Sequence, residues 1–137
     1  MSKCKFPARP EELDKVLQYI EERLDSIGCS IDSKLQISVA VEEIFVNIAH
    51  YAYPDKDGEA EICFSYLDQS KTIIISFIDS GIPYNPLDKE EPDLTLSAED
   101  RKIGGLGIYM VKKSMDRVMY EYKEGKNHLT IIKQIYF

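Results

Sequence analysis

The sequence predicts an α+β fold: a two-layer α/β sandwich in which a mixed, mostly antiparallel sheet carries its helices on one face. The predicted elements follow the order β-α-α-β-β-loop-α-β-β, without an internal repeat. Short hairpins join the strands and the helical segments are grouped, an arrangement that excludes a doubly wound parallel sheet. With 137 residues, of which 44% are hydrophobic and 30% charged, the chain can form one domain, 1–137, with a real core.

The first half of the chain predicts an edge strand and two helices. Residues 2–6 favour the strand, and "PARPEELDKVLQYIEERLDSIG" has apolar residues at helical spacing, with prolines before it and Gly28 to end it. A longer helix is predicted from Ile31 or Asp32 to Tyr53, with Ser30 or Asp32 as its cap and Pro54 after it. Its expected apolar contacts are Leu35, Val41, Phe45, Ile48 and Ala52.

The second half predicts two hairpins separated by a long loop and a helix. "EAEICFSYL" and "KTIIISFID" are rich in β-branched and aromatic residues and are joined by "DQS", which indicates a hairpin. The polar loop 80–103 contains three prolines and is long enough to indicate either a functional lid or a disordered segment. A helix over 105–116, a strand over 117–124, a turn at 125–127 and a strand over 128–137 complete the fold.

Charge and composition exclude several classes of protein. The 17 basic and 24 acidic residues give a net charge of −7, and no basic run stands out, so nucleic acid is not an expected partner. The longest apolar stretch, around residues 73–78, is too short to span a membrane, and the N-terminus lacks the apolar core of a signal peptide. Three widely spaced cysteines fit reduced thiols. We therefore expect a cytoplasmic protein without a membrane partner.

The second predicted helix carries a polar stripe. Glu43 and Asn47 lie about one turn apart on one face, and His50 continues the stripe. Asn47 can offer a neutral oxygen to a divalent cation, while Glu43 can accept a proton from an attacking hydroxyl or water. Glu42 competes as the base, but it lies about 140° around the helix from Asn47, against about 40° for Glu43. A solvated stripe at the rim of the core is the alternative.

A carboxylate follows the buried strand in "FIDSGIPYNP". Asp79 at the end of this strand needs a donor partner, which the exocyclic amine of a purine would supply. Gly81 lets the backbone approach a ligand closely. An ordinary turn after a strand has the same composition, so this motif alone decides little.

Three glycines open the last predicted helix in "GGLGIYMVKKS". The stretch matches neither a phosphate-binding P-loop nor a dinucleotide fingerprint. Each glycine costs about 1 kcal/mol relative to alanine inside a helix, so the cluster indicates a tight turn or a ligand against the backbone. Free N–H groups at a helix N-terminus favour an anion.

Together these motifs resemble the ATP-binding superfamily of gyrase, heat-shock chaperone, histidine kinase and mismatch-repair ATPases (GHKL). They are most similar to its small RsbW/SpoIIAB-like anti-sigma-factor serine/threonine kinases. "EIFVN" resembles the family's Glu-x-x-x-Asn box, "DSGIPYNP" its first glycine box and "GGLGIYMVKKSMDRVMY" its second. The resemblance implies the Bergerat (histidine-kinase-like ATPase) fold, ATP and Mg²⁺ as cofactors, and an ATP lid at about 80–103. It assigns Glu43 as general base, Asn47 as Mg²⁺ ligand, Asp79 as partner of the adenine amine, Gly81 beside the base, Gly104, Gly105, Leu106 and Gly107 along the phosphates, and Thr130 near the adenine end.

The resemblance also implies a function. It predicts an ATP-dependent protein serine/threonine kinase and anti-sigma regulatory factor that phosphorylates a small anti-sigma-antagonist (STAS-type) protein. A sigma factor is a further implied partner, and pairing of two copies through the sheet an implied homodimer. The alternative is an ATP-binding partner-switching module without kinase activity. Arg101 or Lys102 in the lid could reach the γ-phosphate, or the charged run there could be a solvated hinge.

Overall fold

The computed structural model describes residues 1–88 and 105–137, except for the side chain of Leu106. Five strands form one sheet in the order β1-β2-β3-β5-β4. Every pairing between these strands is antiparallel, so the predicted sheet is confirmed except for its mixed character. The strands are β1 (Ser2–Pro7), β2 (Glu59–Leu67), β3 (Thr72–Asp79), β4 (Arg117–Lys123) and β5 (Lys126–Gln134).

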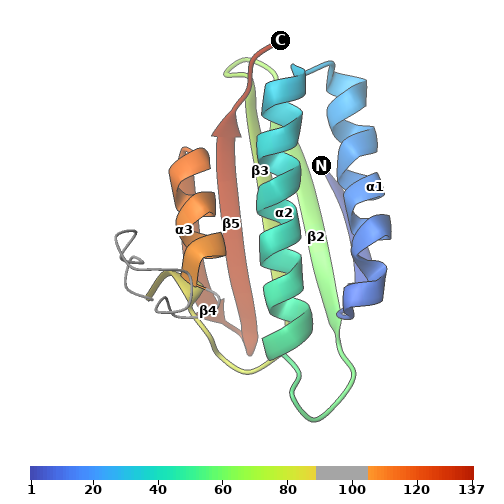
Figure 1. The fold of residues 1–137 in the computed structure, drawn as a ribbon, viewed down its shortest axis with the longest axis vertical. Helices are drawn as coiled ribbons and strands as arrows, with labels where there is room; N and C mark the ends of the chain where they lie inside the picture. Colours follow the sequence, from blue (N-terminus) through green and yellow to red (C-terminus); the bar gives the residue numbers. More distant parts are fainter. Residues whose placement is uncertain (89–104) are drawn as a thin grey trace.

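Three helices cover one face of this sheet, which confirms the two-layer α+β fold (Figure 1). They are α1 (Leu13–Ile27), α2 (Ile31–Tyr51) and α3 (Gly105–Ser114), and short 3-10 turns occur at Pro10–Glu12 and Pro86–Asp88. The helix α2 runs along the middle of the sheet, between α1 and α3 (Figure 1). None of the described helices is long and apolar enough to cross a membrane.

The two faces of the sheet differ in chemistry because successive strand residues point to opposite sides. On β3, Ile73, Ile75 and Phe77 are buried beneath the helices, and Asp79 continues this line at the end of the strand. On β5 the buried positions are Asn127, Leu129 and Ile131. The residues between them face away from the helices. The burial pattern therefore places two polar side chains, those of Asp79 and Asn127, at one end of an apolar core.

Local signals explain where α1 ends and where α2 begins. Gly28 ends α1 in the left-handed region, with φ of 83°, which glycine adopts without strain. Of the two predicted caps of α2, Ser30 is the one observed: its hydroxyl accepts a hydrogen bond from the Ser33 N–H at 3.2 Å. The helix ends at Tyr51, two residues before the predicted end.

One predicted core contact of α2 is wrong. Val41, Phe45 and Ala52 are buried, but Leu35 is 58% exposed. Leu35 lies about 180° around the helix from buried Ile44, so the two cannot face the sheet together. The buried stripe of α2 instead follows Ile37, Ala40, Val41, Ile44 and Phe45.

The last hairpin turns earlier than the sequence predicted. Lys123 pairs with Lys126, so Glu124 and Gly125 alone form the turn. Both have positive φ, 55° and 75°, as a type I′ turn requires. Asn127, predicted as a turn residue, therefore belongs to β5, where it lies opposite Asp79.

Candidate functional site

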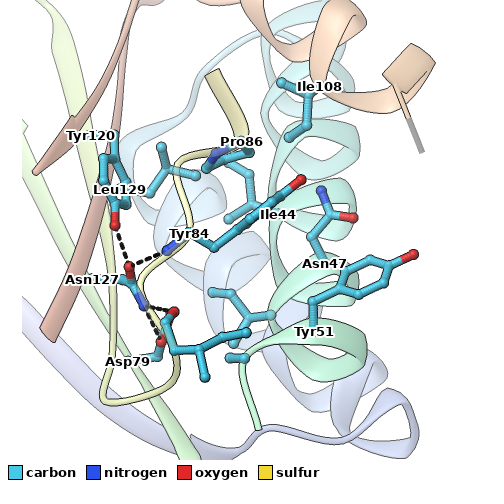
Figure 2. Close-up of a pocket in the computed structure, with 13 residues that line it drawn as sticks. Ile44, Asn47, Tyr51, Asp79, Tyr84, Pro86, Ile108, Tyr120, Asn127 and Leu129 are labelled. Atoms are coloured by element: carbon cyan, nitrogen blue, oxygen red, sulfur yellow. Dashed lines mark hydrogen bonds between the residues drawn. The ribbon is translucent and has the colours of Figure 1, made fainter. Parts of the chain in front are cut away.

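A small pocket lies between the C-terminal half of α2 and the adjoining ends of β3 and β5. Its free volume is about 40 Å³, room for only a few water molecules. Figure 2 shows the Tyr84 side chain extending across this space from the β5 side toward α2. The apolar walls come from Ile44, Ile48, Ala52, Ile82, Pro86, Ile108 and Leu129, and the polar groups from Asn47, Tyr51, Asp79, Tyr84, Tyr120 and Asn127.

Asp79 lies at the floor of the pocket, where β3 ends, and is only 6% exposed. Its Oδ1 accepts two hydrogen bonds of 2.9 Å, from the Gly81 N–H and from Asn127 Nδ2. Both donors approach the same oxygen. Within residues 1–88 and 107–137, no donor to Oδ2 is found, so this oxygen is available to a ligand's N–H group.

Asn127 is the centre of the polar network and was not predicted from the sequence. Nδ2 donates to Asp79 Oδ1 and to the Ile82 carbonyl, both at 2.9 Å. Oδ1 accepts from the Tyr84 N–H at 3.2 Å and from the Tyr120 hydroxyl, as the dashed lines in Figure 2 show. Burial raises the pKa of Tyr120, which keeps this hydroxyl protonated as a donor. Asn127 thus holds Asp79 and the loop after β3 in one arrangement.

A signal for Asn127 does exist in the sequence. Asn127, Leu129 and Ile131 alternate along β5, and a polar residue in such a buried series needs partners. The predicted turn at 125–127 concealed this pattern, because it started the strand one residue after Asn127.

The two predicted site residues on α2, Glu43 and Asn47, lie against different parts of the structure. Asn47 lines the pocket. Glu43, one turn earlier, lies against α3: a Cβ built on Gly107 would be 2.1 Å from Glu43 Oε2 and 2.8 Å from its Cδ. The fold therefore brings together three predicted site residues: Glu43 and Asn47 on α2, and Gly107 on α3. His50 is exposed and is not among the residues that line the pocket.

Gly81 is held against α2. A Cβ on Gly81 would lie 2.3 Å from the Ala52 carbonyl oxygen, and the neighbouring Ile82 N–H donates to that same oxygen at 2.9 Å. The loop after β3 therefore docks on the end of α2, and only glycine permits this approach. The proximity that the sequence suggested for a ligand is here a contact with the protein's own backbone.

The structure does not bring Thr130 to the pocket. Its hydroxyl pairs with Ser76 at 2.9 Å on the face of the sheet that points away from the helices. Because Leu129 and Ile131 point into the core, Thr130 between them must point outward. Gly104, Arg101 and Lys102 lie outside the described residues, as does most of the predicted lid; Gly105 begins α3, and the Leu106 side chain is not described.

Comparison with known proteins decides the family. Residues 6–133 match the family described as histidine kinase-like ATPase domain. The chain belongs to this family. The RsbW-like GHKL resemblance is likewise confirmed: the chain is 28% identical over 128 residues to the serine-protein kinase RsbW of Bacillus licheniformis, covering 88% of this chain and 78% of that protein. It is 27% identical over 127 residues, with the same coverage, to RsbW of Bacillus subtilis strain 168.

Solved structures share the fold of this histidine kinase-like ATPase domain. The RsbU and RsbW domains of Rv1364c from Mycobacterium tuberculosis superpose with a TM-score of 0.68 at 14% identity, over 98% of this chain and 33% of that one. This chain thus spans about a third of that longer protein. The blue-light activated histidine kinase of Erythrobacter litoralis EL346 matches with a TM-score of 0.59 at 14% identity, over 95% of this chain and 62% of that one.

ATP is the nucleotide that family membership implies, and the residues present suit its base. A buried carboxylate with one oxygen fixed can accept from an exocyclic amine, and the apolar side chains that line the pocket suit a flat ring. The present free space is smaller than a purine, and the Tyr84 side chain crosses it (Figure 2). For a divalent cation, Asn47 offers an amide oxygen; no group of three or more His, Cys, Asp or Glu able to hold a metal occurs among the described residues.

Proposed function

We propose that this chain is an ATP- and Mg²⁺-dependent protein serine/threonine kinase and anti-sigma regulatory factor that acts on a small anti-sigma-antagonist (STAS-type) protein. The similar proteins named serine-protein kinase RsbW support the activity. The observation that carries it is the arrangement on α2, where Asn47 lines the pocket and Glu43 lies one turn away beside the first turn of α3. A proton acceptor and a metal ligand thus flank one end of a base-binding pocket.

The pocket residues would bind and orient the nucleotide. Asp79 Oδ2 accepts from the adenine amine, while Asn127 and the Gly81 N–H hold Oδ1 in place. The first turn of α3, which Gly105 begins, directs free N–H groups toward anionic phosphates; Gly104 and Leu106 belong to the same proposal. Bound Mg²⁺, with Asn47 as its protein ligand, would neutralise charge on the phosphates.

Glu43 is the proposed general base. It accepts or orients the proton of the attacking serine or threonine hydroxyl, so that the oxygen can attack the γ-phosphate in line. Glu43 keeps access to this region because Gly107, its neighbour on α3, has no side chain. The proposal assigns no role to Thr130, because its hydroxyl is engaged with Ser76 on the other face of the sheet.

The competing function is an ATP-binding partner-switching module without catalysis. Both functions use the same pocket, and both allow a sigma factor as second partner and a homodimer paired through the sheet. They differ only in whether phosphate is transferred. An assay of phosphate transfer therefore separates the two functions, whereas a measurement of nucleotide affinity does not.

The test incubates the purified protein with Mg-[γ-³²P]ATP and a small STAS-type anti-sigma-antagonist protein. We expect phosphate on a serine or threonine of the partner, and loss of transfer in Glu43→Gln with nucleotide affinity nearly unchanged. Glu42→Gln, one residue away on the same helix, is the matched control and should keep activity. Tight ATP binding without any transfer would favour the module, and loss of nucleotide binding in Glu43→Gln would make Glu43 structural.

A further inference from the structure

The contact between Gly107 and Glu43 joins two elements that are far apart in the sequence. Glu43 lies in the middle of α2, and Gly107 is the third residue of α3. The space that a Cβ of residue 107 would occupy is taken by the Glu43 carboxylate: Oε2 would be 2.1 Å away, Cδ 2.8 Å and Cγ 3.5 Å. Any side chain at position 107 would therefore clash with the carboxylate itself, while it would only touch the stem of Glu43.

The first turn of α3 is also a favourable place for a carboxylate. The first four N–H groups of a helix have no partner within the helix, and the positive end of the helix dipole lies there. Gly107 falls in this turn. The missing side chain of Gly107 leaves the space beside this turn to the Glu43 carboxylate.

From this contact we infer that Gly107 is a positioning residue for Glu43: its missing side chain lets the carboxylate stand at the first turn of α3. The inference rests on the proposed function, in which Glu43 is the base. It also gives Gly107 a use different from the expected one, which was to let the phosphates approach the backbone. An alanine at 107 would displace the carboxylate by roughly 1 Å, the difference between a clash and an ordinary van der Waals contact.

Such a displacement should reduce catalysis without unfolding the protein. Alanine favours a helix more than glycine does, by about 1 kcal/mol, so the substitution does not weaken α3 itself. The far end of a glutamate is flexible and can move away from the new methyl group at little cost. A base displaced by about 1 Å can nevertheless lose about 100-fold in rate. Nucleotide affinity should remain within about twofold, because neither Asp79 nor Asn47 is disturbed.

A double-mutant cycle tests this coupling. Shortening Glu43 to aspartate withdraws the carboxylate by one methylene, about 1.5 Å, and frees the space of the Cβ. We expect Gly107→Ala to reduce the transfer rate about 100-fold when residue 43 is Glu, and by less than about threefold in the Glu43→Asp background. Glu42→Asp is the matched control, and in that background Gly107→Ala should keep its full effect. Equal losses in all three backgrounds would overturn the inference, as would a fall in ATP affinity that accounts for the lost rate.

A second measurement keeps the inference separate from the proposed function. The side-chain carboxyl ¹³C resonance of Glu43, assigned by its absence in Glu43→Gln, should shift in Gly107→Ala while that of Glu42 stays in place. This readout needs neither partner nor phosphate transfer. If wild-type protein transfers no phosphate, the proposed function fails while the resonance still tests the contact. An unchanged Glu43 resonance in Gly107→Ala would show that the glycine does not position the carboxylate.

Discussion

Replacing Asn127 by leucine should destabilise the protein more than any other single polar-to-apolar change on β5. Leucine has the same branched outline as asparagine, with methyl groups in place of the amide oxygen and nitrogen, and cannot hydrogen-bond. The change removes two donated and two accepted hydrogen bonds, one of them to the Asp79 carboxylate. Asn127 is only 6% exposed, so its partners cannot all recover the loss from solvent.

The expected magnitude follows from the partners. A hydrogen bond to a charged group contributes about 1.5–3 kcal/mol, and neutral ones about 1 kcal/mol each. The bonds to the Ile82 carbonyl, the Tyr84 N–H and the Tyr120 hydroxyl are only partly buried, and water can replace part of them. We therefore expect a loss of about 3 kcal/mol in the free energy of unfolding, which lowers Tm by roughly 10 °C for a chain of this length.

Urea unfolding followed by far-ultraviolet circular dichroism measures this loss. Thr130→Val is the matched control, because it is also a near-isosteric change on β5 but removes a single partly buried bond, to Ser76 on the other face. It should cost no more than about 1 kcal/mol. The reasoning is refuted if the two variants differ by less than about 0.5 kcal/mol, since the network around Asn127 would then contribute no more than one hydroxyl pair.

Three further predictions concern residues near the same end of the sheet. Asp79→Asn should leave the protein folded but weaken ATP binding about 100-fold in calorimetric titration, because the amide would turn a donor toward the adenine amine; unchanged affinity would remove Asp79 from the base-binding site. Gly81→Ala should cost about 2 kcal/mol of stability, since its methyl group would clash with the Ala52 carbonyl, a backbone atom that cannot easily move; a variant as stable as wild type in urea would contradict the docking of this loop on α2. Burial raises the pKa of Tyr53, so the folded state favours the neutral phenol. The contribution of this phenol to the free energy of unfolding is complete below its unfolded-state pKa of about 10. It is lost as the pH rises above that value. The stability advantage of wild type over Tyr53→Phe should therefore shrink above pH 10 in urea unfolding measured across the alkaline range, and a constant difference would show that burial does not perturb this phenol.

The periodic elements were predictable because their side chains alternate or recur with the geometry of the element. The strand Glu59–Leu67 has the predicted bounds, and Gly28 ends α1 as expected. The helix α2 was predicted too, but Leu35 was assigned to the wrong side, because a helix rich in apolar residues does not reveal by composition which stripe is buried. Which stripe of α2 is buried depends on where the sheet lies relative to the helix.

The site was predictable where a motif fixes the spacing and not where it depends on strand register. Glu43 and Asn47 are one helical turn apart whatever surrounds them, so their shared face followed from the sequence. Whether Asn127 or Thr130 faces the pocket depends on the residue at which β5 begins, and an error of one position exchanges the two faces. The contact between Glu43 and Gly107 could not be predicted, because it requires the packing of α3 beside α2.

Ligand recognition depends on the length of the two-residue turn at Glu124 and Gly125, which lies between β4 and β5. This turn sets the register that places Asn127 opposite Asp79, although neither turn residue lines the pocket. Inserting one residue after Gly125 could shift β5 against β3, present His128 to the helices and leave Asp79 without its amide partner. Related sequences that bind the same nucleotide in the same way should therefore keep residues that tolerate positive φ in this turn and should rarely change its length.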